Sequence, residues 1–572
     1  FKYVITAFLS SMLLGSCNYL DFDETNGLKT KEDMYKYFNT TKGMLTHVYS
    51  YIPQDFGTIG SAMRDCASDD AEFGAIGATV QNFNNGNWSP IKTTDTAWNL
   101  YNGVRAANAF IKDIAEVDFS RYEYDGTYEN NMKQLKYFPY EAKVLRAFYF
   151  FELARRYGDI AMPLEVLSTE EANSIGKTPF NEVIRFIVET CDEAAAGDNL
   201  PVSYANEPGA EVGRVTKGFA MALKSKALLY AASKLHNPSM DVELWKTSAK
   251  AAFDLIKTGI YSLDNRETAN NLSSKEAVLM RANGDNSNFE LYNFPIRFTL
   301  GKRPAANISY STFPSQNLVD AFETVNGYPV TLGANGWVCE DPAFDPLKPY
   351  ENRDPRFYRA VLANGMEFKG STIETFVGGS DDVPVSQGGS PTGYFLRKYI
   401  QPTTSFTPGQ EVKTKHHWVI YRYAETLLTY AESMVCAFKD PKYTGKEFDN
   451  KSAEWALNEV RVNAGMPPVN ISDPNEFMRA LQNEWRVEFA FEDHRFWDVR
   501  RWKIGYDTQR LLYGVRIVNE SGNLRFYRNL YENRTWKECM NLYPIPQNEL
   551  FKNPKSMATL YVVVCSHFKS GL

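Results

Sequence analysis

The chain has 572 residues, of which 44% are hydrophobic and 23% charged, and its formal net charge is -7. This length allows several domains or one extended repeat array, and the acidic balance without long basic runs excludes nucleic acid as a partner. Its 34 Tyr, 37 Phe and 10 Trp exceed what a core needs, and rings left at a surface usually indicate ligand binding.

The first predicted element is an apolar N-terminal segment that ends at a cysteine. Lys2 precedes an uncharged run from Tyr3 to Leu14, which is typical of a secretion signal and too short to span a bilayer. Two small residues follow, and the next position carries Cys17, a thiol that can be acylated, as in a bacterial lipobox. We therefore predict a signal peptide over residues 1–16 and a lipid anchor on Cys17. The alternative is a buried N-terminal core segment.

Amphipathic helices in pairs are the next predicted elements, with small residues where two helices must approach each other. Thr30 and Asp33 suit a capping box at the start of the first pair, and Gly259 and Gly465 suit helix ends. Such pairs are typical of tetratricopeptide-type units, which bury their apolar faces by stacking on neighbours; an irregular helical bundle is the alternative. The predicted pairs are 30–51 with the helix around 101–111, 139–158 (Pro139 in its first turn) with a helix opened by Thr178 and Pro179, 215–238 with 245–259, and 421–434 with 452–465.

Two segments between the helices, 52–95 and 264–416, have a different composition. They are rich in Gly, Asn, Ser, Pro and aromatic residues and contain short strand-like stretches without helical periodicity. Long structured loops on a rigid scaffold are where binding sites tend to lie. We therefore predict a mainly α fold, a tetratricopeptide-like array of helical pairs with loop-rich, small-β ligand-binding insertions. We divide it into a helical part, 17–263, and a C-terminal part, 264–572.

Rings in these loops are the candidate ligand contacts. A sugar ring has an apolar C–H face that an exposed Trp or Tyr covers, while Asn, Asp and Arg at the edge bind its hydroxyl groups. For each ring taken singly, local packing is the alternative. From composition and loop position, the candidate glycan-binding residues are Trp88 with Asn85 in an Asn-rich turn, Tyr292, Phe294, Tyr310 and Trp337.

Glu484, Glu488 and Glu492 stand four residues apart on one predicted helical face, and a glycosidase is one interpretation. Catalytic carboxylates flank a bond from different elements, however, whereas a crowded helix with nearby arginines forms a structural ion network. The six histidines have no HExxH spacing and no GxSxG elbow occurs, so we predict no catalytic residue, no metal and no cofactor. The arginines expected to neutralise the helix are Arg486, Arg495, Arg500 and Arg501, and the expected core anchors are Phe489, Phe496 and Trp497.

The stretch NEWRVEFAFEDHRFWDVRRWKIG, residues 483–505, resembles the signature helix of the SusD/RagB family of nutrient-binding lipoproteins of Bacteroidetes. Other fragments resemble the family in the same order, and the likeness covers most of the chain. They are WNLYNGVRAANAFI, EAKVLRAFYFFELARRYGDI, NRDPRFYRAVL, TGYFLRKY, YRYAETLLTYAES, LNEVRVNAG and LYPIPQNEL. Residues 556–572 depart from the family, whose members commonly end in a short Pro/Gly tail.

The resemblance implies a helical array with a loop-rich ligand face, anchored by lipid in the outer membrane and facing the cell surface. It also implies a partner, a SusC-like, TonB-dependent barrel transporter, which receives the captured oligosaccharide uncut. Members similar to RagB are associated with peptides, so a peptide ligand is the first alternative. A surface glycoside hydrolase and a helical scaffold that grips only protein are the other two.

Overall fold

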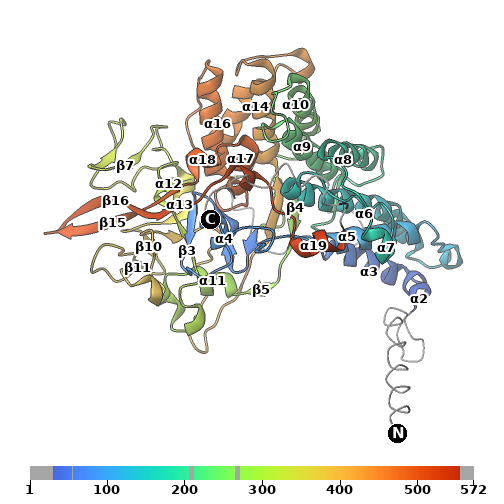
Figure 1. Cartoon of the computed structure of the whole chain (residues 1–572), viewed down its shortest axis with the longest axis horizontal. Coiled ribbons are helices and arrows are strands. Elements are labelled where there is room, and N and C mark those ends of the chain that lie inside the picture. The colour runs from blue at the N-terminus through green and yellow to red at the C-terminus, as the bar shows by residue number, and fades with distance from the viewer. Residues whose placement is uncertain (1–29, 54–55, 205–210, 265–270, 554, 556–572) are drawn as a thin grey trace, which may run out of the picture.

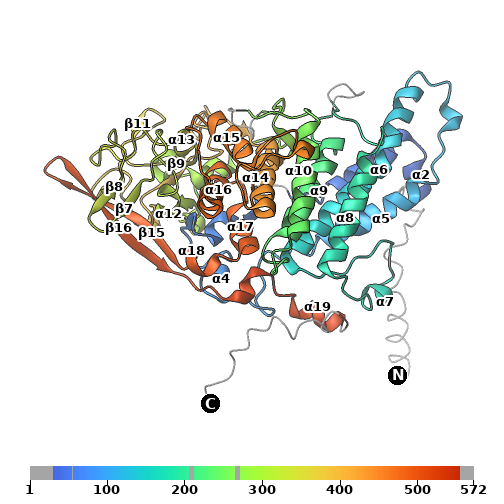
Figure 2. The ribbon, with the colours of Figure 1, turned by 90° about the horizontal axis from the view of Figure 1, so that it is seen from above.

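Helices form one side of the molecule, and loops with short strands form the other (Figure 1). The same division is visible from above (Figure 2). The computed structural model describes residues 30–53, 56–204, 211–264, 271–553 and 555. The predicted signal peptide 1–16, the predicted anchor Cys17 and the divergent segment 556–572 lie outside the described residues.

The long helices stack one on the next in chain order, and this order continues across the long segment between α10 and α14. Helices far apart in sequence are therefore direct neighbours in one array, which favours stacking over an irregular bundle. The stacked helices are α3 (Phe38–Tyr49), α5 (Leu100–Ile114), α6 (Tyr128–Tyr157), α8 (Phe180–Ala195), α9 (Lys217–Ala232), α10 (Val242–Lys257), α14 (Tyr423–Phe438) and α15 (Ala453–Asn463).

The remaining helices extend the array or lie among the loops. The helix α16 (Pro474–Glu488) packs on α14, and α17 (Arg495–Trp502) follows it in the chain. The shorter helices are α2 (Lys31–Tyr35), α4 (Gln81–Asn84), α7 (Thr169–Ala172), α11 (Asn288–Asn293), α12 (Gln316–Val319), α13 (Pro355–Ala360), α18 (Gly505–Thr508) and α19 (Gln547–Lys552).

Local signals at several helix ends act as predicted. Thr30 and Asp33 form the capping box of α2, in which each side chain accepts a hydrogen bond from the other residue's backbone N–H. Gly259 and Gly465 follow α10 and α15 with positive φ angles of 64° and 87°. In this left-handed region a side chain is strained, so glycine suits both helix ends.

The start of α6 differs from the prediction. The helix begins at Tyr128, so Pro139 lies inside it instead of in its first turn. An internal proline costs a helix about 3 kcal/mol. Tyr137 and Phe138 are buried on the same stretch, and burying each ring contributes about 1.5–3 kcal/mol. Tertiary packing therefore offsets the local penalty.

The start of α8 also differs in its cap. Thr178 does not cap the helix; its backbone N–H donates to the Ile160 carbonyl at 2.7 Å. Asp159 supplies the cap, because its Oδ1 accepts from the Phe180 N–H at 2.9 Å. Asp159 lies just after α6, 21 residues before Phe180, so no local sequence motif predicts that it caps α8.

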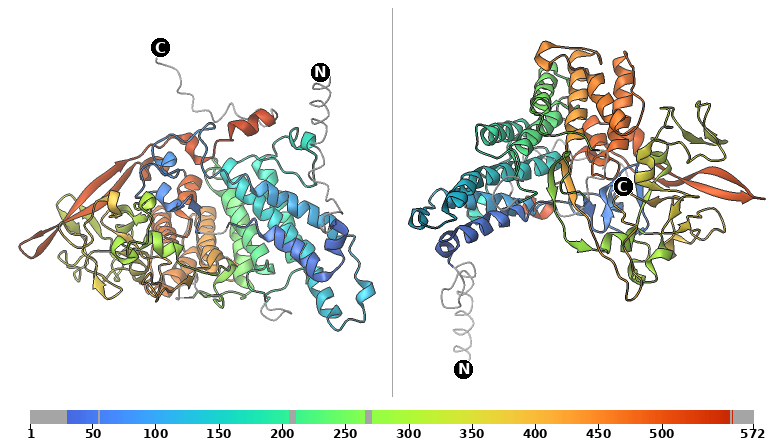
Figure 3. Two further views of the ribbon diagram at one scale, coloured as in Figure 1. Left: turned by 90° about the horizontal axis from the view of Figure 1, so that it is seen from below. Right: turned by 180° about the vertical axis from the view of Figure 1, so that it is seen from behind.

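The strands form two-stranded antiparallel sheets throughout the described residues, which confirms the predicted small-β insertions. The longest pair, β15 (Leu511–Glu520) with β16 (Asn523–Asn533), projects from the body as a hairpin (Figure 3). The other pairs are β1 (Thr58–Ile59) with β2 (Ala62–Met63), β3 (Ala71–Phe73) with β6 (Thr312–Pro314), β4 (Ala277–Arg281) with β14 (Trp418–Arg422), β5 (Asp285–Asn286) with β13 (Thr414–Lys415), β7 (Thr331–Gly333) with β8 (Gly336–Val338), β9 (Val361–Leu362) with β12 (Phe395–Leu396), and β10 (Glu367–Phe368) with β11 (Ser371–Thr372).

The β3–β6 pair joins the two predicted loop segments, because Ala71 lies opposite Pro314 and Phe73 opposite Thr312. The largest apolar cluster likewise contains buried residues from both sides of the predicted boundary at 263/264, a division that stays a prediction. Within the described ranges, no helix combines the length and the apolarity needed to cross a membrane.

Candidate functional site

Two of the predicted rings meet on the loop side of the molecule. Tyr292 of α11 and Tyr310, just before β6, are both half-buried, and their ring centroids lie 6.4 Å apart at an interplanar angle of 43°. Behind them the buried ring of Phe73, in β3, packs edge-on against Tyr310 with centroids 5.4 Å apart. We call this arrangement the Tyr292–Tyr310 platform: two partly exposed rings supported by a buried one.

A buried arginine ties together the two segments that carry the platform rings. Arg303 is 3% exposed. It donates from Nε to the Leu291 carbonyl at 2.9 Å, from Nη1 to the Ile308 carbonyl at 3.0 Å, and from Nη2 to the Phe294 carbonyl at 2.8 Å. Burial lowers the pKa of Arg303 to about 10, so the guanidinium stays charged at neutral pH. The distance between the two tyrosines is therefore set by charge-assisted hydrogen bonds.

The loop at Gly74 lies against the backbone of residues 309–311, just beside Tyr310. The Gly74 N–H donates to the Ser311 carbonyl at 3.1 Å, and a Cβ at position 74 would lie 2.3 Å from the Ser309 carbonyl oxygen. Only glycine fits there without displacing the backbone. Ile76, two residues after this contact in the chain, is 81% exposed.

Two exposed polar side chains lie close in sequence to the residues of the platform and its support. Asn288 is exposed one helical turn before Tyr292, and Lys302 is exposed next to the buried Arg303. Rings with an amide group on the same helical face offer both kinds of contact that a sugar requires, an apolar face and hydrogen-bonding groups.

The exposure expected of Trp88 is wrong, because this ring is buried. It is 8% exposed, and its centroid lies 4.5 Å from that of Phe83 and 4.7 Å from that of Tyr543. The Asn-rich turn leaves Asn85 exposed but directs Trp88 inward, onto a residue more than 450 positions away in sequence. A loop composition does not reveal such a partner.

Phe294 and Trp337 also differ from the two tyrosines. Phe294 is 1% exposed and packs edge-on against Phe368, with centroids 5.3 Å apart, so its expected exposure is wrong. Trp337 of β8 is half-buried, 5.8 Å from Tyr350 and 6.1 Å from Phe526 between ring centroids. Its neighbours are not those of the platform, so the structure brings together only Tyr292 and Tyr310 among the predicted rings.

The carboxylates of the signature stretch form a buried ion network, as predicted. Arg356 pairs with Glu484 and, at 2.8 Å, with Glu488. Arg422 pairs with Glu488 at 2.7 Å and with Glu492 at 2.8 Å. Burial opposes ionisation of Glu488, but Arg422 and Arg356 outweigh it and hold the pKa of its carboxyl at about 2. Carboxylates held in this way are structural groups.

The arginines expected to neutralise this network have other partners. Arg486 pairs with Asp70 and Arg495 with Asp69, while Arg501 pairs with Glu432. Arg500 donates to backbone carbonyls. Arg486 lies within α16, two residues from both Glu484 and Glu488, so its side chain leaves the helix on another face. The other three arginines lie in α17, and the chain turns between the end of α16 at Glu488 and the start of α17. The expected anchors Phe489, Phe496 and Trp497 are buried, as predicted.

Sequence reasoning did not identify Phe73 of the platform, the supporting Arg303 or the exposed Ile76 as site residues. The sequence GAIG at 74–77 was a signal for a tight loop that exposes an apolar side chain. Arg303 carried no signal, because its three acceptors come from a helix end and a separate turn. No group of His, Cys, Asp and Glu among the described residues has the arrangement of a metal site.

Comparison with known proteins places this geometry in a family. A sequence profile described as the SusD family matches residues 275–558. SusD-like protein P2 of Formosa agariphila is 24% identical over 444 residues, which is 73% of this chain and 72% of that protein. The crystal structure of a SusD-like protein of Bacteroides fragilis is similar at a TM-score of 0.73 with 26% identity, covering 92% of this chain and 98% of that one.

A second structure from Bacteroides fragilis, described as a SusD-like carbohydrate-binding protein, has a TM-score of 0.72 and 22% identity. It covers 91% of this chain and 99% of that one, and at this identity the likeness concerns the fold. The profile match, the helical array with small two-stranded sheets and the signature stretch agree, and the chain belongs to the SusD family.

Proposed function

We propose that this protein is a lipid-anchored receptor on the outer-membrane surface that binds an oligosaccharide and passes it to a SusC-like, TonB-dependent transporter. The single observation that carries the proposal is the Tyr292–Tyr310 platform, two partly exposed rings held at a fixed separation. SusD family proteins are typically outer-membrane surface lipoproteins, and one structural relative is described as carbohydrate-binding. The lipid anchor on Cys17 follows from the sequence alone.

The platform suits capture followed by release. Ring contacts contribute about 0.5–1.5 kcal/mol each beyond the area that they bury. Two such contacts with a few hydroxyl hydrogen bonds correspond to dissociation constants of roughly millimolar to tens of micromolar. A receptor of that affinity holds a sugar at the surface and still yields it to a partner.

Binding without cleavage is the second part of the proposal. SusD family proteins bind carbohydrate and are not catalysts. In this chain Glu484, Glu488 and Glu492 are occupied by Arg356, Arg422 and neighbouring cations, which leaves no free pair of carboxylates in the signature stretch to act as acid and nucleophile.

Titration calorimetry against a panel of neutral oligosaccharides tests the proposal. We expect binding by the wild type and at least a fivefold weaker affinity after Tyr310→Ala. Tyr124→Ala is the matched control, since Tyr124 is 94% exposed on the helical side and should leave the affinity unchanged. Equal affinities of all three proteins would refute the platform. Binding of peptides but not of sugars would establish the peptide alternative, and release of shortened sugars would establish a hydrolase.

Isolation from native membranes tests the transfer to a transporter. We expect the protein to co-purify with a large outer-membrane barrel and to leave the membrane fraction after Cys17→Ser. A Cys17→Ser protein that stays membrane-bound would contradict the anchor, and a wild-type protein that never co-purifies with a barrel would contradict the partner.

A further inference from the structure

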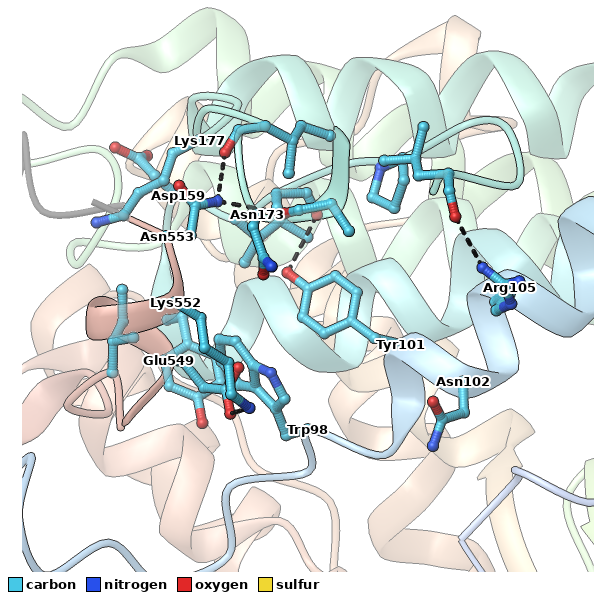
Figure 4. A pocket seen from close by; sticks show the side chains of 18 of the residues that line it. Trp98, Tyr101, Asn102, Arg105, Asp159, Asn173, Lys177, Glu549, Lys552 and Asn553 are labelled. Atoms are coloured by element: carbon cyan, nitrogen blue, oxygen red, sulfur yellow. Dashed lines mark hydrogen bonds and ion pairs between the residues drawn. The ribbon is translucent and has the colours of Figure 1, made fainter. Parts of the chain in front are cut away.

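A cavity lies on the helical side, and it shares no residue with the platform. Its volume is about 280 Å³, and it is enclosed by α5, by the connection from α6 to α8, and by α19 (Figure 4). This volume lies just below the roughly 300–1,000 Å³ range of sites for drug-sized ligands, so the cavity suits a small ligand such as one or two sugar rings. We call it the Trp98 cavity, after a partly exposed ring at its wall.

Three rings form the apolar wall of the Trp98 cavity. The Trp98 centroid lies 5.2 Å from that of Tyr101 and 5.3 Å from that of Tyr157, both edge-on. Hydrogen bonds fix the two tyrosines: Tyr101 donates to the Ala161 carbonyl at 3.1 Å and Tyr157 to the Thr96 carbonyl at 2.7 Å. The faces offered to the cavity are therefore held in place before any ligand arrives.

The connection from α6 to α8 forms the opposite wall, and hydrogen bonds from side chains on two other elements hold it in place. Arg105 of α5 donates to the Leu167 carbonyl at 2.9 Å, and Asn553, just after α19, donates to the Ile175 carbonyl at 2.8 Å. Both bonds are drawn in Figure 4. The connection from α6 to α8 is thus tied to α5 at one point and to the end of α19 at another, and the cavity keeps its shape.

Charges around the Trp98 cavity balance. Its lining contains three cationic and three anionic side chains. Lys552 is paired with Glu549 at 2.9 Å. Lys177 is half-buried, and burial lowers the pKa of its amine while the nearby Asp159 carboxylate opposes this change. Within the described part of the chain, the Lys177 amine forms no ion pair. It is therefore a hydrogen-bond donor at the cavity wall, near the Asp159 carboxylate as an acceptor. The charged lining residues are Arg105, Lys177, Lys552, Asp159, Glu165 and Glu549.

We infer that the Trp98 cavity is a second saccharide site, which takes one or two neutral sugar units. A pyranose stacked on the Trp98 and Tyr101 rings presents its hydroxyl groups to the donor Lys177 and the acceptor Asp159, which together suit a neighbouring pair of hydroxyls. The cationic and anionic side chains of the lining are equal in number, so the cavity has no surplus charge to neutralise a charged ligand. An ionic ligand is therefore disfavoured. Only the ligand class rests on the proposed function; the residues are independent of the platform.

Fluorine NMR of protein labelled with 5-fluorotryptophan tests this inference, since Trp98→Phe assigns the resonance of residue 98. The probes are cellobiose, maltose and mannobiose at about 10 mM, a concentration that occupies a millimolar site. We expect at least one of them to shift the Trp98 resonance in the wild type and equally in Tyr310→Ala. We expect Lys177→Met, which keeps the stem and removes the donor, to weaken that shift at least fivefold. Lys112→Met is the matched control, because Lys112 is exposed on α5 and does not line the cavity.

The outcomes separate the inference from the proposed function. A Trp98 resonance that moves in Tyr310→Ala supports the second site even if the platform fails. A Trp98 resonance that no neutral sugar moves overturns the second site, even if calorimetry finds binding that depends on Tyr310. An equal effect of Lys177→Met and Lys112→Met on the shift also overturns it.

Discussion

Replacing Arg303 by methionine is the sharpest test of how the platform is held. Methionine keeps an unbranched apolar stem but removes all three bonds from the guanidinium to the carbonyls of Leu291, Phe294 and Ile308. The change leaves Tyr292 and Tyr310 themselves intact. Any effect on the platform then reports the support and not the rings.

The expected loss follows from the contacts of Arg303. Hydrogen bonds from a charged group contribute about 1.5–3 kcal/mol each. Against them stands the burial of the charge: the shift of the Arg303 pKa from 12.5 to about 10 corresponds to about 3 kcal/mol. The Phe294 side chain is almost fully buried, so water cannot readily reach the adjoining carbonyl. We expect Arg303→Met to destabilise this region by about 2–6 kcal/mol.

Amide hydrogen exchange measures this loss where it occurs. The reporters are the N–H groups of Gly74, Tyr310 and Thr312, which donate to Ser311, Asn307 and Asn293. If local opening governs exchange, a loss of about 3 kcal/mol accelerates it roughly a hundredfold. The control is Arg516→Met, a change at an exposed arginine of β15, which should leave these rates unchanged. Wild-type exchange rates in Arg303→Met would refute the reasoning.

The remaining predictions concern the buried groups. Trp88→Ala should lower the free energy of unfolding by about 3–5 kcal/mol and leave sugar affinity unchanged, and an affinity loss like that of Tyr310→Ala would contradict the burial of this ring. The carboxyl of Glu488 has a folded pKa of about 2 against an ordinary 4.5, so its stabilisation of about 3 kcal/mol is complete above pH 4.5 and is lost as pH falls toward 2. Acid titration of the unfolding free energy should therefore be less steep in Glu488→Gln, and identical curves would remove Glu488 from the network. Burial raises the pKa of the Cys436 thiol to about 12, so the native protein should resist thiol reagents at this residue, and rapid labelling without unfolding would contradict its burial.

The ion network around Glu484, Glu488 and Glu492 was predicted correctly, but the arginines predicted to pair with these carboxylates were wrong. Spacing alone placed Glu484 and Glu488 on one face of a helix, and the abundance of arginine nearby indicated neutralisation. The arginines that pair with these glutamates, Arg356 and Arg422, lie on other elements, more than 60 positions away from them in sequence. The arginines of α17 are closer in sequence, but after the turn that follows α16 they bind other carboxylates or, for Arg500, backbone carbonyls.

Several features could be predicted from the sequence, because each depends on residues close together in the chain. They are the helices, the capping box at Thr30, the glycines that end α10 and α15, and the family resemblance. Exposure was not readable, since it depends on what a distant segment places against a ring. Trp88 is covered by Tyr543, whereas Tyr310 is supported from behind by Phe73 and keeps part of its surface open. The same reason explains Pro139, which stays inside α6 because tertiary burial of its neighbours outweighs a local preference. Local patterns thus determined which elements form, and the packing between distant segments decided which side chains are left to bind a ligand.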